Sequence, residues 1–247
     1  MDNHLQRSME ILGGPSSSDR FRIEHVMGMP VIVDVRDDEV PHGALDDVFA
    51  WLRHVDATFS VYKADSEISH INRGELTEAE ASAEVRAVLV RCEELRIETG
   101  GYFDVRAASP QSLDPSGLVK GWAVDRAAEI LERAGLRNFA VNAGGDMRLR
   151  GRAAPAWSWR VGIQHPLHPD AVTRVIETNE LAVATSGEYE RGQHVLDPHT
   201  RRPPGGILSV RSWGPTSPPL TRMRRRPSRW APQAQSAGQR ASGATTR

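Results

Sequence analysis

Helical patterns come first in this sequence, and short strand patterns follow them. Residues 41–55, 83–99 and 119–134 carry apolar side chains at the three- and four-residue spacing of a helix with one buried face. Pro41 opens the first of these patterns, and glycines end the other two. Because helices and strands are grouped rather than alternating, the sequence favours an α+β fold with a mainly antiparallel sheet over a doubly wound parallel sheet.

Strand patterns are short, and Gly, Pro, Asn or Asp residues bound them. Strands are expected on both sides of a bend at Met27 and Gly28, and then over residues 139–142, 147–150, 157–163, 172–176 and 181–185. Residues 1–19, with their Gly, Pro and Ser residues, are expected to form a flexible lead-in. The sequence therefore predicts one domain over residues 20–210, without an internal repeat.

The composition is that of a globular protein, with 39% hydrophobic residues and a formal net charge of -1 over 247 residues. No apolar run approaches the length of a membrane span, and the first residues do not resemble a secretory signal. The single cysteine, Cys92, cannot form an internal disulfide, which fits a reducing compartment. We therefore expect a cytoplasmic protein without a membrane span.

Charge is unevenly distributed along the chain. No acidic residue follows Asp197, whereas the last fifty residues contain ten arginines. A basic segment can bind nucleic acid, but this one has no lysine and is interrupted by Pro, Ser and Gly. Since a nucleic-acid-binding function would depend on this segment alone, we expect no nucleic-acid partner.

Polar clusters lie where helices and strands are expected to end, which is where loops present side chains to ligands. Residues 59–67 read Phe-Ser-Val-Tyr-Lys-Ala-Asp-Ser-Glu, so that Tyr62 precedes a helix cap at Asp65 or Ser66. A packed tyrosine and a structural cap would explain this cluster as well as a ligand site would.

A second cluster spans residues 113–125 and places Asp114 and Gly117 before an expected helix, with Lys120 in its first turn. A lysine is unfavourable at the positive end of a helix, so one there indicates a bound anion. Lys120 is also one of only two lysines beside 29 arginines. The alternative is a solvated surface lysine.

Two more clusters follow. Residues 141–146, Val-Asn-Ala-Gly-Gly-Asp, could bring backbone amides close to a phosphate or could simply form a hairpin turn. Residues 185–189 and 194–198 combine hydroxyl groups with His194, which could act as a base or be a structural histidine. Neither a G-x-S-x-G nor an H-E-x-x-H motif is present, so phosphate chemistry fits better than a serine hydrolase or a zinc protease.

In this order, the clusters resemble the ApbE family, the FAD:protein FMN transferases. The resemblance extends from about Glu24 to Val210 and is carried by seven short motifs. These are Met27-Gly28, Phe59 to Asn72, Thr99 to Asp104, Lys120 to Asp125, Asn142 to Asp146, Thr185 to Gly187, and His194 to Pro198.

The resemblance implies an α+β domain that binds FAD and Mg²⁺ and transfers FMN to a Thr or Ser hydroxyl of an acceptor flavoprotein, releasing AMP. The acceptor would carry a Ser/Thr-Gly-Ala-Thr/Ser motif. The positions that would contact FAD are Met27, Tyr62, Tyr102, Phe103, Asp104, Asp114, Lys120 and Leu196. Gly117 falls at a metal-binding position where a backbone carbonyl can serve, and His194 falls at the position of the catalytic base. Cleaving a pyrophosphate needs positive charge on its oxygens more than covalent help, which fits this residue set.

The sequence departs from the family pattern after Val210. There the family has Ala-Asp-x-x-Ala-Thr, whose oxygens complete the Mg²⁺ shell, whereas residues 211–247 are an Arg/Pro-rich tail. One allowed codon choice for residues 215–230, read from the third base, encodes Asp-Leu-Ala-Pro-Ala-Asp-Ala-Asp-Ala-Thr-Ala-Ala-Phe-Ala-Met-Gly, which contains such a motif. We interpret the tail as a candidate frameshift. Two alternatives stay open, an FAD pyrophosphatase and an inactive FAD-binding protein that lacks the metal motif.

Overall fold

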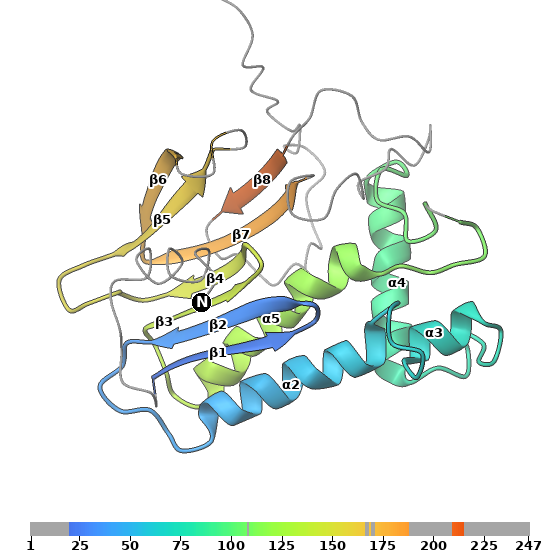
Figure 1. Ribbon diagram of the computed structural model, residues 1–247, viewed down its shortest axis with the longest axis horizontal. Coiled ribbons are helices and arrows are strands. Elements are labelled where there is room, and N and C mark those ends of the chain that lie inside the picture. Colours follow the sequence, from blue (N-terminus) through green and yellow to red (C-terminus); the bar gives the residue numbers. More distant parts are fainter. Residues whose placement is uncertain (1–19, 108, 166–167, 169–170, 188–208, 215–247) are drawn as a thin grey trace, which may run out of the picture.

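The computed structural model describes residues 20–107, 109–165, 168, 171–187 and 209–214 (Figure 1). The helices are α2 (Ala44–Phe59), α3 (Glu67–Asn72), α4 (Ala83–Glu98) and α5 (Ser116–Arg133). The strands are β1 (Phe21–Val26), β2 (Met29–Val35), β3 (Phe139–Ala143), β4 (Asp146–Arg150), β5 (Trp159–Gln164), β6 (Val172–Thr178), β7 (Glu180–Gly187) and β8 (Ser209–Gly214).

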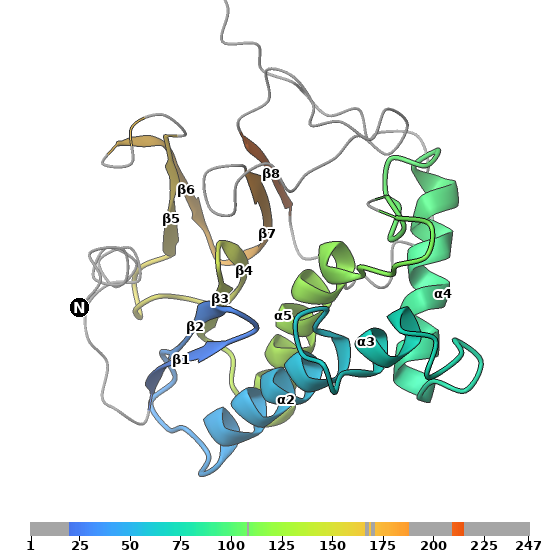
Figure 2. The same ribbon diagram turned by 45° about the vertical axis from the view of Figure 1, so that its right-hand side comes forward.

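Strands β1, β2, β3, β4, β7 and β8 form one sheet in that order, and β5 and β6 form a separate hairpin. All of these strand pairs are antiparallel. Helices α2 and α5 cover one face of the sheet, and the β5–β6 hairpin lies on the opposite side (Figure 2). The predicted α+β fold with a mainly antiparallel sheet is therefore confirmed.

Alternation along β2 divides the interior into two cores. Val31, Val33 and Val35 are fully buried against the helices, whereas Ile32 belongs to a second core with Trp159 of the hairpin. This alternation arises because successive side chains of a strand point to opposite faces of its sheet. The sheet is consequently buried on both faces around β2.

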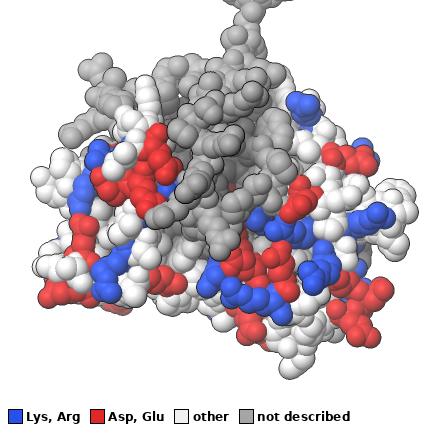
Figure 3. All heavy atoms as spheres, turned by 180° about the vertical axis from the view of Figure 1, so that it is seen from behind, with Lys and Arg blue, Asp and Glu red and all other residues white. Residues whose placement is uncertain are grey.

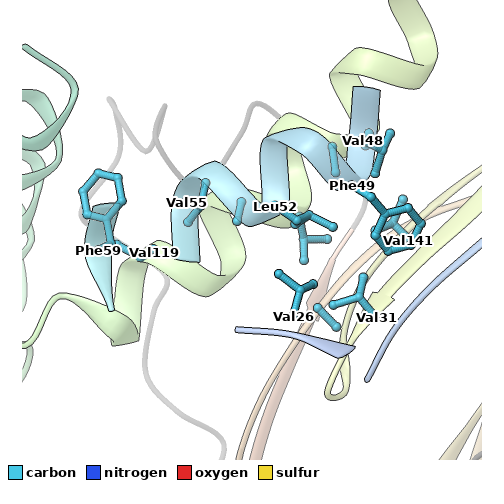
Figure 4. Close-up of a cluster of buried hydrophobic side chains, with 14 of the residues drawn as sticks. Val26, Val31, Val48, Phe49, Leu52, Val55, Phe59, Val119 and Val141 are labelled. Carbon is cyan, nitrogen blue, oxygen red and sulfur yellow. The ribbon is translucent and has the colours of Figure 1, made fainter. Parts of the chain in front are cut away.

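The helix-side core is built by the apolar face of α2. Val48, Phe49, Leu52 and Val55 are fully buried, and they point from α2 toward the sheet and α5 (Figure 4). Their spacing of three and four residues places them on one side of the helix. The predicted buried face is therefore confirmed, although the helix begins at Ala44, after the Gly43 N-cap, rather than at Pro41, and extends to Phe59.

Helix α5 begins earlier than the sequence predicts. Its first residue is Ser116, not Val119, and the Asp114 carboxylate accepts a hydrogen bond from the Ser116 amide at 3.0 Å. An acceptor at this place satisfies one of the free amides of a helix start, which allows the earlier beginning. Lys120 is thus the fifth helical residue rather than a first-turn residue, and the prediction of its position was wrong.

Acidic and basic side chains are interspersed over the described surface on the face seen in Figure 3. Many of them pair, as Arg53 does with Glu24 and Arg96 with Glu93. None of the helices in the described part of the chain is long and apolar enough to cross a membrane. The lead-in (residues 1–19) and residues 215–247 of the basic tail lie outside the described residues.

A buried acid, Asp34, lies on the hairpin side of β2. Its Oδ2 accepts a hydrogen bond from Arg36 Nη2 at 2.6 Å, and its Oδ1 has no hydrogen bond within the described residues. The Arg36 guanidinium lies 5.9 Å from the ring centroid of Trp159. Burial raises the pKa of Asp34 from 3.8 to about 6, against the opposing effect of Arg36.

This pKa predicts a pH-dependent cost to stability. Because the folded protein holds the Asp34 proton up to about pH 6 and the unfolded chain releases it near 3.8, the free energy of unfolding falls as the pH rises from about 4 to 6 and levels off above 6. The full cost is about 3 kcal/mol. Asp34→Asn, which can still accept the Arg36 hydrogen bond, is expected to remove this cost.

Urea unfolding of wild type and Asp34→Asn between pH 4 and 8 measures the difference. We expect the variant to gain stability relative to wild type as the pH rises, with most of the gain between pH 4 and 6. Asp47→Asn, an exposed change on α2, should follow the wild-type curve. Parallel curves for wild type and Asp34→Asn would contradict the prediction.

Candidate functional site

The turn between β1 and β2 has a strained backbone. Val26 and Met29 pair directly, which leaves Met27 and Gly28 as a two-residue turn with φ values of 58° and 71°. Two positive φ values are typical of a type I′ hairpin turn. Met27 is the one non-glycine residue with a positive φ in the described part of the chain. Such strain costs on the order of 1–3 kcal/mol and is concentrated at functional sites, so this hairpin tip is a site candidate.

The turn between β3 and β4 packs against the same hairpin. Gly144 and Gly145 have φ values of 52° and 85°, and the Gly145 amide donates to Asn142 Oδ1 at 3.0 Å. A Cβ added at Gly144 would lie 2.9 Å from Met29 Sδ, so the Met29 side chain would have to shift to admit a larger residue. Glycine favours the positive φ of this turn and allows the close approach of Met29.

The loop after α4 brings an aromatic residue to the start of α5. Gly100 and Gly101 end the helix with positive φ values, and the Phe103 amide then donates to Thr99 Oγ1 at 2.9 Å. The Phe103 ring packs on α5, because a Cβ added at Gly117 would lie 3.3 Å from Phe103 Cε2. Gly117 thus leaves room for Phe103 beside the first turn of α5.

Asp114 is held in place by its backbone. Its amide donates to the Val105 carbonyl at 2.8 Å, next to Asp104. The Asn72 side chain binds both backbone groups of the preceding residue, Leu113, at 2.7 Å and 3.0 Å. Asn72 closes the resemblance motif that begins at Phe59, and the structure shows that it fixes the segment leading to Asp114.

Lys120 reaches from α5 to the β3–β4 turn. Its Nζ lies 3.3 Å from Oδ1 of Asp146, whose side chain is 9% exposed. This ion pair places a partly buried ammonium beside the Gly144–Gly145 turn. Sequence reasoning gave Asp146 no role, although the motif of paired glycines followed by an acid contains it.

Tyr62 and Tyr102 are among the most exposed large side chains of the described residues, at 88% and 70%. Tyr62 follows α2, whose Phe59 ring packs edge-on against Trp122 of α5 with the centroids 5.5 Å apart. Exposed aromatic rings next to such a site are suited to stacking on a planar ligand. The described structure leaves both rings accessible for such contact.

Contacts therefore join most of the expected site residues at one end of α5. Gly144 brings the β3–β4 turn against Met29, Lys120 reaches Asp146 of that turn, the Phe103 ring packs at Gly117, and Asp114 is bonded to Val105 beside Asp104. Met27 precedes Met29 by two residues, at the tip of the β1–β2 hairpin. Tyr62 and Tyr102 lie in the loops that follow α2 and α4. His194 and Leu196 lie outside the described residues.

The described residues alone do not make a metal centre. Within them, no group of three or more His, Cys, Asp or Glu side chains could hold a metal ion. Asp114 and the Gly117 carbonyl offer oxygen atoms of the kind that Mg²⁺ prefers.

Comparison with known proteins supports the resemblance to the ApbE family. The model of the ApbE family matches residues 27–112 and 106–213. The chain is 37% identical over 100 residues to the FAD:protein FMN transferase of Vibrio cholerae, an alignment that covers 37% of this chain and 30% of the relative. It is 27% identical over 235 residues to the FAD:protein FMN transferase of Haemophilus influenzae, covering 70% of this chain and 68% of the relative.

Solved structures share the fold. The flavin transferase ApbE from Vibrio cholerae superimposes with a TM-score of 0.68 at 23% identity, covering 78% of this chain and 81% of that one. The ApbE protein from Thermotoga maritima gives a TM-score of 0.67 at 22% identity, covering 77% and 80%. The resemblance drawn from the sequence motifs is confirmed by the family match, and the chain belongs to the ApbE family.

Proposed function

We propose that this chain transfers FMN from FAD to a Thr or Ser hydroxyl of an acceptor protein and releases AMP. The observation that carries the proposal is Lys120, held 3.3 Å from Asp146 beside the Gly144–Gly145 turn. Relatives named FAD:protein FMN transferase support the same activity.

In this proposal, the end of α5 binds the diphosphate of FAD. Lys120 supplies positive charge to the non-bridging oxygens, and the left-handed Gly144–Gly145 turn lets backbone amides approach them closely. Fixed positive groups stabilise the charge that develops as the bond between the two phosphates breaks. Tyr62 and Tyr102 provide rings for stacking on the planar ends of FAD.

His194 and Gly117 have proposed roles that come from the family resemblance. His194 would accept the proton of the acceptor hydroxyl as that oxygen attacks the FMN phosphorus. The Gly117 carbonyl would be one ligand of a Mg²⁺ ion, which would neutralise phosphate charge when bound. The acceptor would be a flavoprotein with a Ser/Thr-Gly-Ala-Thr/Ser motif.

Intact-protein mass of an acceptor that contains Ser-Gly-Ala-Thr, after incubation with FAD, Mg²⁺ and the chain, tests this function. A second version of the chain should carry the restored reading frame, and with it the Asp- and Thr-containing motif, after Val210. We expect a mass gain of one FMN with the restored chain and a rate at least 10-fold lower with the present chain, because its tail lacks those metal ligands.

Three other results would each lead to a different conclusion. Free FMN and AMP without an adduct would indicate an FAD pyrophosphatase, in which water replaces the acceptor hydroxyl. Bound FAD without any product would indicate a flavin-binding protein. Equal rates for the two versions would show that the metal is held without the motif missing from the tail.

A further inference from the structure

Three acid–base pairs join α5 to β4. In each pair one side chain comes from the helix and the other from the helix-facing side of the strand. They are Lys120 with Asp146 at 3.3 Å, Asp125 with Arg148 at 3.0 Å, and Glu132 with Arg150 at 2.5 Å. The first pair lies at the proposed diphosphate site, and the third lies toward the other end of α5.

The middle pair is nearly inaccessible to water. The side chains of Arg148 and Asp125 are 7% and 6% exposed. Burial lowers the pKa of Arg148, and Asp125 opposes that effect. Arg148 Nε lies within ion-pair distance of Asp125 Oδ1 but makes no hydrogen bond within the described residues. A buried ion pair of this kind is seldom more stable than an apolar pair of similar volume, so stability does not explain its presence.

The spacing of the first two pairs indicates that they set the position of α5 along β4. Asp125 follows Lys120 by five helical residues, an advance of about 7.5 Å. Arg148 follows Asp146 by two strand residues, an advance of about 6.6 Å. The two pairs therefore advance almost equally along the helix and the strand. Since β4 is held on both sides by β3 and β7, contact between Asp125 and Arg148 sets how far α5 lies along the strand.

We propose that Asp125 and Arg148 are positioning residues that hold Lys120 in register with the Gly144–Asp146 turn, and so set the site that receives a diphosphate. They do not touch the ligand themselves. The inference rests on the proposed function only for the identity of that ligand. The register of Lys120 against the turn is a property of the protein without FAD.

The test replaces the middle pair by apolar residues of similar size, Asp125→Leu together with Arg148→Met. We expect the double variant to keep the wild-type melting temperature to within a few degrees and to bind FAD at least 10-fold more weakly. A merely structural pair would show the reverse, a lower melting temperature with unchanged FAD affinity. The matched control is Glu132→Gln with Arg150→Gln, on the same helix and strand, which should leave FAD affinity unchanged.

Lysine NMR provides a readout that does not need FAD. The chain has only two lysines, so protein labelled with ¹³C-lysine gives one set of signals for Lys120 and one for Lys63, an internal reference paired with Asp56. In the apolar double variant we expect the Lys120 signal to move toward that of free lysine while Lys63 stays in place. If the double variant does not fold, Asp125→Glu, which keeps the charge but adds one methylene, should give a smaller shift in the same direction.

The outcomes separate the two proposals. An unchanged Lys120 signal overturns the positioning inference, whether or not FAD affinity changes. A shifted Lys120 signal in a chain that shows no FAD binding even as wild type supports the inference and refutes the proposed function. A shifted signal together with a 10-fold loss of FAD affinity supports both.

Discussion

Replacing His194 with alanine is expected to slow FMN transfer by roughly 10²- to 10⁴-fold, the usual contribution of a general base, while FAD still binds. The hydroxyl of a Thr or Ser is a weak nucleophile at neutral pH, and loss of its proton to a nearby base activates it. Because His194 would act on the acceptor and not on FAD, the change should lower the rate without a comparable change in FAD affinity.

Single-turnover transfer to the acceptor, followed by protein mass, together with a separate FAD titration, measures the two effects. His54→Ala is a suitable control, since His54 is an exposed histidine paired with Glu84 on the helical side of the molecule. Added imidazole should restore part of the lost rate in His194→Ala. Transfer at the wild-type rate in His194→Ala would remove this residue as the base.

Replacing Lys120 with methionine is expected to weaken FAD binding by roughly 10- to 100-fold, since a hydrogen bond to a charged group contributes about 1.5–3 kcal/mol. Methionine keeps most of the volume and the unbranched shape of the side chain while removing its charge. The loss should be larger at low ionic strength, where the attraction between the ammonium and the diphosphate is least screened.

FAD fluorescence titrations at two salt concentrations measure this effect. Arg126→Met is the matched control, because it removes a cation from the same helix. The Arg126 side chain is 43% exposed and pairs with Glu129. That variant should bind FAD as wild type does. Equal affinities for wild type and Lys120→Met would show that the diphosphate of FAD does not bind at Lys120. The proposed function would then lose its main structural support.

Local features could be predicted from the sequence because they depend on neighbours in the chain. The buried face of α2 and the turn at Met27 and Gly28 were predicted and are confirmed. A cap at Asp65 or Ser66 was predicted, and it is Ser66, whose side chain accepts from the Ser69 amide at 3.0 Å. Periodicity, φ preference and capping each act over a few residues. The site motifs indicated the family for the same reason, since each motif is a short stretch of the chain.

Pairing between distant segments could not be predicted in this way. The sequence patterns did not indicate that β5 and β6 leave the main sheet, so that β4 pairs with β7, nor that β8 adds a further strand beside β7. Which strands pair depends on what can be buried on both faces of the sheet, and local alternation carries no information about the partner.

The candidate site shows the same division. The sequence by itself predicted that Asp114, Gly117, Lys120 and the Gly144–Gly145 turn stand where a phosphate ligand could bind. Only the tertiary structure decided that Lys120 meets Asp146 and that Asp125 meets Arg148, because these contacts join a helix to a strand that is separate from it in the chain. A charged side chain has many potential partners along a sequence, and packing of the backbone decides which of them lie within reach.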